Sequence, residues 1–276
     1  MQLPYTCKAV YAFNMRNCFI CEGSVPEQYC VVDGHAYLKC PACGLIYVDS
    51  VDDWDVLYRA YDGGFWKSLR RGLVLPFRRF RHCRDFGKSM ERARGIVEFI
   101  RRLGIDESAG IEFLDIGCNK GFLLAAAIEQ SWDVYGVEVV PELLVPFRRE
   151  YPRYADRVIA GKLADARSVL EKVKFDVITA IDVLEHFEDP AEIMGMIHSM
   201  LKPGGVFVIQ TPDTASAPAP GDAPRWGALK PLEHLQLFNS ANLALAARRA
   251  GFEEPDLCPP FEEADGNLVA VLRRAG

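Results

Sequence analysis

The feature that most constrains the fold is an apolar segment that runs into a turn punctuated by glycine. Residues 112–121 read Glu-Phe-Leu-Asp-Ile-Gly-Cys-Asn-Lys-Gly, and an apolar segment of helical character follows from Phe122. About twenty residues after the turn, a second apolar segment ends in the carboxylate of Glu138. A strand, a glycine turn, a helix and a second strand that ends in an acid form the unit with which α/β folds hold adenosine-containing cofactors. The turn lets the backbone approach the ligand, and Glu138 can accept hydrogen bonds from ribose hydroxyls.

The turn itself differs from a dinucleotide-binding turn at its first position. It reads D-x-G-C-x-x-G and begins with Asp115, whereas the dinucleotide turn reads G-x-G-x-x-G. A carboxylate at this position would repel a pyrophosphate but attract a ligand that carries an ammonium group. The turn resembles motif I of the class I S-adenosylmethionine (SAM) methyltransferases. Many relatives have glycine where this chain has Asn119, and asparagine tolerates the left-handed backbone that such a turn requires.

Two later segments extend the resemblance to residues 111–275. Residues 175–186 resemble the fourth strand of these enzymes and the loop after it, and residues 201–211 resemble the fifth strand with its preceding turn. The resemblance implies an α/β fold with a Rossmann-like, seven-stranded methyltransferase sheet. It also implies a SAM site, to which we assign Asp115, Gly117, Cys118, Gly121, Glu138, Val139, Leu163 and Asp182. A doubly wound domain with another nucleotide ligand is the alternative, but acids at two strand ends favour SAM.

Four cysteines near the start of the chain stand in two C-x2-C pairs. Cys18 and Cys21 form the first pair, and Cys40 and Cys43 follow after eighteen intervening residues. This spacing predicts a small N-terminal zinc-ribbon module in which two tight knuckles supply four thiolates to one structural Zn²⁺ ion. Four protein ligands leave no open position on the metal, so we do not expect a catalytic zinc. Four reduced thiols without metal are the alternative.

Cysteine usage and hydropathy indicate where the protein works. Nine cysteines in a chain that lacks an apolar leader-like start indicate a reducing compartment, so we expect a cytoplasmic protein. The most apolar run, residues 122–128, is seven residues long, whereas a membrane span needs roughly 20. We therefore expect no membrane span. The sequence carries no indication of an oligomeric state.

Charge is unevenly distributed, and the chain divides into a zinc ribbon (1–50), a basic helical connector or lid (51–108) and a SAM-binding domain (109–276). Residues 67–102 contain twelve Lys or Arg and three Asp or Glu, while the whole chain has a net charge of −6. The +9 of this segment therefore leaves −15 for the rest. The segment could close over SAM and face an anionic or carrier-bound substrate. An amphipathic connector with a solvated basic face is the alternative.

A segment with loop composition, residues 212–231, leaves the carboxyl end of the predicted fifth strand. Ligands of α/β sheets bind at this edge, and long loops inside compact domains are often functional lids. Trp226 in this segment could stack on substrate, or it could anchor the loop as a plain apolar side chain.

Two histidines are candidates for the chemistry. Methyl transfer is an in-line displacement at the sulfonium carbon, and a protonated nucleophile also needs a base, for which histidine has a suitable pKa. Of the five histidines, His186 and His234 are each preceded by glutamate and follow predicted strand-end loops. The pair Glu185 and His186 resembles that of ubiquinone-biosynthesis O-methyltransferases. The pair Glu233 and His234 resembles that of sugar C-methyltransferases with an N-terminal zinc module, whose histidine acts as base, although Pro231 replaces their tyrosine. We favour His234 as the base, oriented by Glu233 or by a nearby carboxylate, over His186; purely structural histidines are the third alternative.

These observations favour a small-molecule methyltransferase that acts on a sugar, a surface-polysaccharide intermediate or a secondary-metabolite intermediate. The first alternative is an RNA methyltransferase, because some ribosomal-RNA enzymes of this fold carry N-terminal zinc fingers and the basic segment could contact phosphates. The acidic balance of the remaining chain argues against nucleic acid as a partner. The second alternative is a non-catalytic SAM-binding scaffold, against which the intact cofactor motifs argue.

Overall fold

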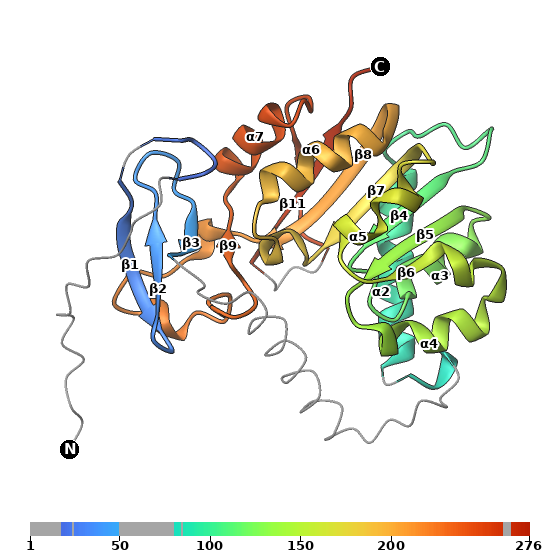
Figure 1. The fold of residues 1–276 in the computed structure, drawn as a ribbon, viewed down its shortest axis with the longest axis horizontal. Coiled ribbons are helices and arrows are strands. Elements are labelled where there is room, and N and C mark those ends of the chain that lie inside the picture. Colours follow the sequence, from blue (N-terminus) through green and yellow to red (C-terminus); the bar gives the residue numbers. More distant parts are fainter. Residues whose placement is uncertain (1–17, 24, 50–79, 84, 262–265) are drawn as a thin grey trace.

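The computed structural model describes residues 18–23, 25–49, 80–83, 85–261 and 266–276. These residues form two β-sheets, one of seven strands and one of four (Figure 1). The larger sheet carries the predicted cofactor turn, and the smaller sheet carries the four cysteines at one end. Contacts between the two sheets bring distant parts of the chain together, and these contacts shape the site described below.

The larger sheet is mixed and has the strand order β10-β11-β8-β7-β4-β5-β6. Its strands are β4 (Glu112–Ile116), β5 (Asp133–Glu138), β6 (Val158–Ala160), β7 (Phe175–Ile181), β8 (Leu201–Pro212), β10 (Asp256–Cys258) and β11 (Asn267–Arg273). Strands β4 to β8 are parallel to one another, whereas β11 runs antiparallel between β8 and β10. This arrangement confirms the predicted α/β fold with a seven-stranded methyltransferase sheet.

Helices pack on both faces of this sheet. They are α2 (Phe86–Arg101), α3 (Phe122–Glu129), α4 (Pro141–Glu150), α5 (Leu163–Leu170), α6 (Pro190–Met200) and α7 (Ser240–Arg249), with the 3-10 turns η1 (Phe80–His82), η2 (Pro152–Arg157), η3 (Leu184–His186), η4 (Thr214–Ser216) and η5 (Ala223–Arg225). Phe113 of β4 joins the apolar cluster under α2, α3 and α4, while its neighbour Leu114 joins the cluster under α5, α6 and α7. Successive strand residues point to opposite faces, so a strand covered on both sides is apolar throughout. Within the described residues, none of the helices combines the length and apolar character that crossing a bilayer requires.

The smaller sheet combines residues from two distant parts of the chain. Its strands are β1 (Glu27–Val32), β2 (His35–Lys39), β3 (Ile46–Val48) and β9 (Gln236–Leu237), paired in that order and all antiparallel. Asp33 and Gly34, with φ of 48° and 83°, form the tight hairpin turn between β1 and β2. Strand β9 follows the long loop after β8, so the sheet that begins near the cysteines is completed from the methyltransferase part of the chain (Figure 1).

The long segment over residues 212–231 packs against this smaller sheet. Ala223 and Leu229 are buried in one apolar cluster with Tyr37 and other residues of the small sheet, and Trp226 packs against the same cluster. The position of Trp226 therefore favours the anchoring role over stacking on substrate.

The predicted connector over residues 51–108 is described only in part. Its residues 51–79, which include much of the basic charge, lie outside the described residues. Its last part is helix α2, which buries Ile96, Val97 and Ile100 against the large sheet. The three-part division of the chain stays a prediction, although residues near the cysteines share an apolar cluster with the large sheet.

Candidate active site

A cavity of about 760 Å³ opens beyond the carboxyl ends of β4, β5 and β7. Of the eight predicted cofactor residues, seven line it: Asp115, Gly117, Cys118, Glu138, Val139, Leu163 and Asp182. Gly121 does not line the cavity. It precedes α3 with a φ of 78°, and a Cβ there would lie 2.5 Å from Cδ2 of Phe147. Gly121 therefore allows the close packing of α3 and α4 behind the turn.

The turn between β4 and α3 is held against β5 by backbone hydrogen bonds. The amides of Gly117 and Cys118 both donate to the carbonyl of Val137, at 2.8 and 3.0 Å. Gly117 has a φ of 71° and Asn119 a φ of 49°, so asparagine adopts the left-handed conformation predicted for it. A Cβ on Gly117 would clash with Val183 across the cavity. Glycine at this position therefore lets the side chain of Val183 pack closely against the turn.

Glu138 is oriented by the backbone around it. Its two carboxylate oxygens accept hydrogen bonds from the amides of Asn119 and Val140, each at 2.9 Å. Burial raises the pKa of Glu138, and these hydrogen bonds act in the opposite direction. A carboxylate oxygen can accept two hydrogen bonds, so each oxygen retains acceptor capacity for a ribose hydroxyl.

Asp115 is buried at the end of β4. Its Oδ1 accepts a hydrogen bond of 2.7 Å from Oγ1 of Thr179. Burial raises the pKa of Asp115 to about 7, and the nearby charge of Glu138 adds to this shift. A cation in the cavity would favour the carboxylate form, because opposite charge lowers the pKa of an acid. This environment suits the ammonium group of an amino-acid-like ligand.

Asp182 connects the end of β7 to two other elements. Its Oδ1 accepts from Nε2 of Gln210 at 2.8 Å, and its Oδ2 accepts from Nη2 of Arg92 at 3.3 Å. Arg92 belongs to α2 and also lines the cavity. Arg92 is one of twelve basic residues in segment 67–102, and nothing in the local sequence distinguishes it from the others.

The two candidate histidines meet at the rim. His186 lines the cavity, whereas His234 lies behind it and is only 8% exposed. Nδ1 of His186 is 2.6 Å from the carbonyl oxygen of Glu233, and Nδ1 of His234 is 2.8 Å from that of Ala228. A carbonyl only accepts hydrogen bonds, so these contacts place a proton on Nδ1 of each ring.

Burial keeps both rings neutral near pH 7. It lowers the pKa of His234 to about 4, with a further contribution from neighbouring His186, and it also lowers the pKa of His186. Glu233 lines the cavity too, but it orients His186 through its backbone carbonyl, while its carboxylate lies 3.6 Å from Nζ of Lys230. The carboxylate contact predicted between Glu233 and His234 is therefore replaced by two carbonyl contacts.

Glu185, which precedes His186 in the chain, is a buried acid. It is 1% exposed, its Oε2 accepts from Oγ1 of Thr211 at 2.9 Å, and burial raises its pKa to about 8. One potential ligand atom from each of Glu185, His186 and His234 lies within 4.8 Å of the others.

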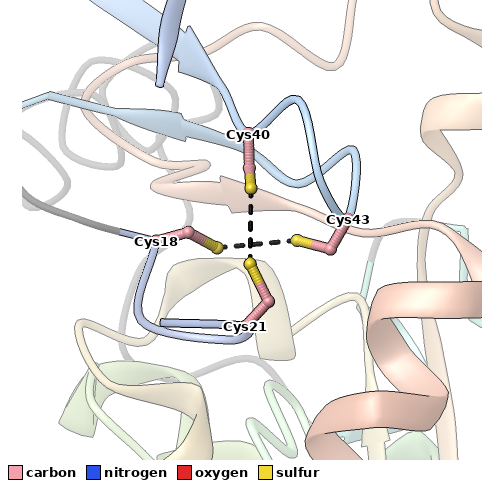
Figure 2. Close-up of side chains that lie close together, drawn as sticks. All are labelled: Cys18, Cys21, Cys40 and Cys43. Atoms are coloured by element: carbon pink, nitrogen blue, oxygen red, sulfur yellow. Dashed lines mark hydrogen bonds between the residues drawn. The ribbon is translucent and has the colours of Figure 1, made fainter. Parts of the chain in front are cut away.

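The four cysteines predicted to bind zinc converge on one point (Figure 2). Sγ of Cys18 lies 3.5 Å from Sγ of Cys43, and Sγ of Cys21 lies 3.5 Å from Sγ of Cys40. Tetrahedral zinc with Zn–S bonds of about 2.3 Å would separate the sulfurs by about 3.8 Å. The hydrogen bond between Cys18 and Cys43 lowers the pKa of Cys18 to about 5 and raises the pKa of Cys43, and the thiolate is the form that binds metal. The donor set fits structural zinc.

The chain is similar in sequence to known methyltransferases. The methyltransferase-domain family matches residues 88–254, more than half of the chain. A protein of Mycolicibacterium smegmatis named as a probable SAM-dependent methyltransferase is 30% identical over 156 residues, 56% of this chain and 57% of its own. A ubiquinone biosynthesis O-methyltransferase of Pseudomonas aeruginosa is 31% identical over 112 residues, 39% of this chain and 48% of its own. The alignments span about half the length of these curated relatives.

The fold is similar to that of solved methyltransferases. The 1,6-didemethyltoxoflavin-N1-methyltransferase of Burkholderia thailandensis, solved with 1,6-didemethyltoxoflavin and S-adenosylhomocysteine, has a TM-score of 0.54 and is 19% identical. The similarity covers 91% of this chain and 99% of that one. At such low identity it is evidence for the fold alone. Sequence and fold agree, and the chain belongs to the methyltransferase-domain family, within the class I SAM-dependent methyltransferases.

Proposed function

We propose that this protein transfers the methyl group of SAM to a small-molecule acceptor with the assistance of a histidine. The observation that carries the proposal is the composition of one cavity. Asp115 and Glu138 line it at the ends of β4 and β5, and His186 lines it at the end of β7. A cofactor site and a candidate base therefore share one space, as a transfer between two bound molecules requires.

The cofactor would be held by the turn and by the two strand-end acids. Glu138 accepts hydrogen bonds from the ribose hydroxyls, Asp115 faces the ammonium group, and Leu163 and Val139 border the adenine. SAM supplies a methyl group that is activated by the positive charge on sulfur. The chain's own contribution is to align an acceptor with that methyl group and to exclude water from the space between them.

The base belongs to the pair His186 and His234. The sequence favours His234, and that assignment stays a prediction. The position of His186 in the cavity wall supports it as the group that first receives a proton from the acceptor, with His234 behind it. Glu233 holds His186 in the required tautomer through its carbonyl oxygen.

The described cavity wall supports a small acceptor over RNA. Seven carboxylic residues line it (Asp115, Glu138, Asp182, Glu188, Asp189, Glu192 and Glu233), against three cationic residues (Arg92, Lys120 and Lys162). Such a wall does not favour a phosphate backbone. An acceptor held there, such as a sugar or a secondary-metabolite intermediate, is better matched if it is uncharged or cationic. The anionic acceptor expected from the basic segment would depend on residues 51–79.

We further propose that Cys18, Cys21, Cys40 and Cys43 hold one structural Zn²⁺ ion. The support is the convergence of four sulfurs from two knuckles, in which the amide of Glu22 donates to the carbonyl of Cys18 and the amide of Gly44 to that of Cys40. Zinc would contribute folding free energy and no catalytic step.

The test has two stages. Calorimetry should detect SAM and S-adenosylhomocysteine binding to the intact chain, because the cofactor site does not depend on the acceptor. A screen for S-adenosylhomocysteine release should then compare sugar nucleotides, phenolic and heterocyclic metabolites, and total RNA. Turnover with a small molecule supports the proposal; turnover with RNA alone overturns the acceptor class, and absence of SAM binding overturns the function.

A further inference from the structure

One short segment, residues 232–237, belongs to both the active-site cavity and the small sheet. Leu232, Glu233 and Leu235 line the cavity, and the segment then continues directly into β9, which pairs with β3. This part of the cavity wall is thus the extension of β9, and its partner strand β3 begins three residues after Cys43.

Hydrogen bonds join this segment to the catalytic rim on one side and to the small sheet on the other. The amide of Leu235 donates to the carbonyl of Glu185 at 2.9 Å, and the carbonyl of Leu235 accepts from the amide of Val48 at 2.9 Å. Oη of Tyr37 donates to the carbonyl of His234 at 3.1 Å, and the Tyr37 side chain is fully buried. The backbone that positions both histidines is therefore bonded to β2 and β3.

The other end of these strands is bonded to the cysteine cluster. The amide of Cys40 donates to the carbonyl of Leu45, immediately before β3. The carbonyl of Cys43 accepts from the side-chain amides of Asn239 and Asn242, each at 3.2 Å. Both asparagines lie at the start of α7, directly after β9. The knuckle of Cys40 and Cys43 is thus bonded both to the residue that precedes β3 and to the start of α7.

We propose that the four-cysteine module is a positioning element for the acceptor side of the active site, with Tyr37 as its main contact to the histidine pair. The small sheet buries little surface of its own, so a bound metal would add to the order that its contacts with the larger sheet provide. Loss of metal would loosen β3, and with it the hydrogen bonds that hold Leu235 and His234. The cofactor turn would be spared, because its amides bond to Val137 and Glu138. This inference rests on the proposed function.

The test uses the full chain and needs no acceptor. Hydrogen exchange is measured for the amides of Val48 and Leu235, with the amide of Gly117 as an internal reference, before and after zinc removal by a chelator. Exchange at the first two positions should accelerate at least tenfold while exchange at Gly117 and the calorimetric affinity for SAM stay unchanged. Equal acceleration at all three positions would mean general unfolding, and no acceleration at Val48 and Leu235 would mean no coupling; either result overturns the proposal.

A pair of variants tests the contact without removing metal. Tyr37→Phe deletes the hydroxyl that bonds to His234, while Tyr29→Phe deletes a hydroxyl of the same sheet that bonds to the carbonyl of Pro218 at 2.6 Å. Tyr37→Phe should accelerate exchange at Leu235 roughly three- to tenfold, the effect of losing one hydrogen bond, and should shift the imidazole NMR signals of His186 and His234. Tyr29→Phe should do neither. Identical spectra and exchange rates for the two variants would overturn the proposal, whereas loss of SAM binding in the unmodified chain would instead refute the proposed function.

Discussion

The imidazole rings of His186 and His234 meet edge to face with their centroids 5.0 Å apart. The carbonyl that accepts the hydrogen bond of His186 belongs to Glu233, 47 residues further along the chain. Each ring donates from Nδ1 to a backbone carbonyl. Only His186 lines the cavity. We therefore expect the loss of His186 and the loss of His234 to affect turnover differently.

Replacing His186 with Ala should lower turnover by about 10²–10⁴, the usual contribution of a general base. His234→Ala should lower turnover less, because His234 does not contact the cavity directly. Steady-state rates on the acceptor found by screening, with SAM affinity measured in parallel, check this order. If His234→Ala is the more damaging change, His234 is the base that the sequence favours. If neither change matters, the reaction proceeds by positioning alone.

Replacing Glu138 with Ala should weaken SAM binding by one to two orders of magnitude or more. Each hydrogen bond from a hydroxyl to a charged group contributes roughly 1.5–3 kcal/mol. The matched control is Glu142→Ala, which removes an exposed carboxylate at the start of nearby α4. Calorimetry measures the affinity of both variants for SAM. If Glu138→Ala binds SAM as tightly as Glu142→Ala does, Glu138 is not part of the SAM site.

Binding of SAM should release a proton below about pH 7. Burial raises the pKa of Asp115 to about 7 in the absence of ligand, and a bound ammonium group favours the carboxylate. Affinity should therefore rise as pH increases from about 5.5 and level off above about 7, by up to a factor of about ten per pH unit. Calorimetry in buffers of different ionisation enthalpy counts the protons released. Asp115→Asn should abolish the release; if it persists in that variant, another group is responsible.

The folded protein should lose stability as the medium becomes acidic because of His234. Its pKa falls from an ordinary 6.5 to about 4 on folding, so the folded state binds the proton more weakly than the unfolded state. The stability associated with the neutral ring is complete above pH 6.5 and is lost as pH falls from there through about 4. The loss should be at most about 3 kcal/mol. Denaturant unfolding of the wild type and of His234→Gln at several pH values measures this loss. If the unfolding free energy depends on pH equally in both proteins, His234 is not the group responsible.

Purified protein should contain one zinc ion per chain. Four converging thiols provide the site, and Cys40→Ser should remove the metal. Because Cys40 and Leu45 share a buried cluster with Leu243 of α7, this change should also lower the thermal stability of the larger domain. Metal analysis and calorimetric scans test both points. A ratio of two ions per chain would instead point to a second ion at Glu185, His186 and His234.

Local chemistry made much of the cofactor half predictable. Asp115, Asn119 and Glu138 lie in one strand-turn-helix-strand unit, so their spacing alone indicates their positions. The acceptor half could not be predicted in the same way. Strand β9 has two residues, too few for any periodicity to show, and its pairing with β3 depends on tertiary packing. The orientation of His234 likewise depends on a contact with the backbone carbonyl of Ala228. A backbone contact of this kind leaves no pattern in the side chains.

Tyr37 and His234 are joined by a hydrogen bond although they lie 197 residues apart in the chain. Contacts of such long sequence separation form late, because the closure of a large loop must precede them. During synthesis on the ribosome, the first strands would emerge long before β9 exists to complete their sheet. Until β9 is made, the edge of β3 would be unpaired, and an unpaired strand edge is prone to pairing with other chains. The edge of β3 is covered only when Gln236 and Leu237 arrive to pair with it, so folding of the cysteine region is completed by the last quarter of the chain.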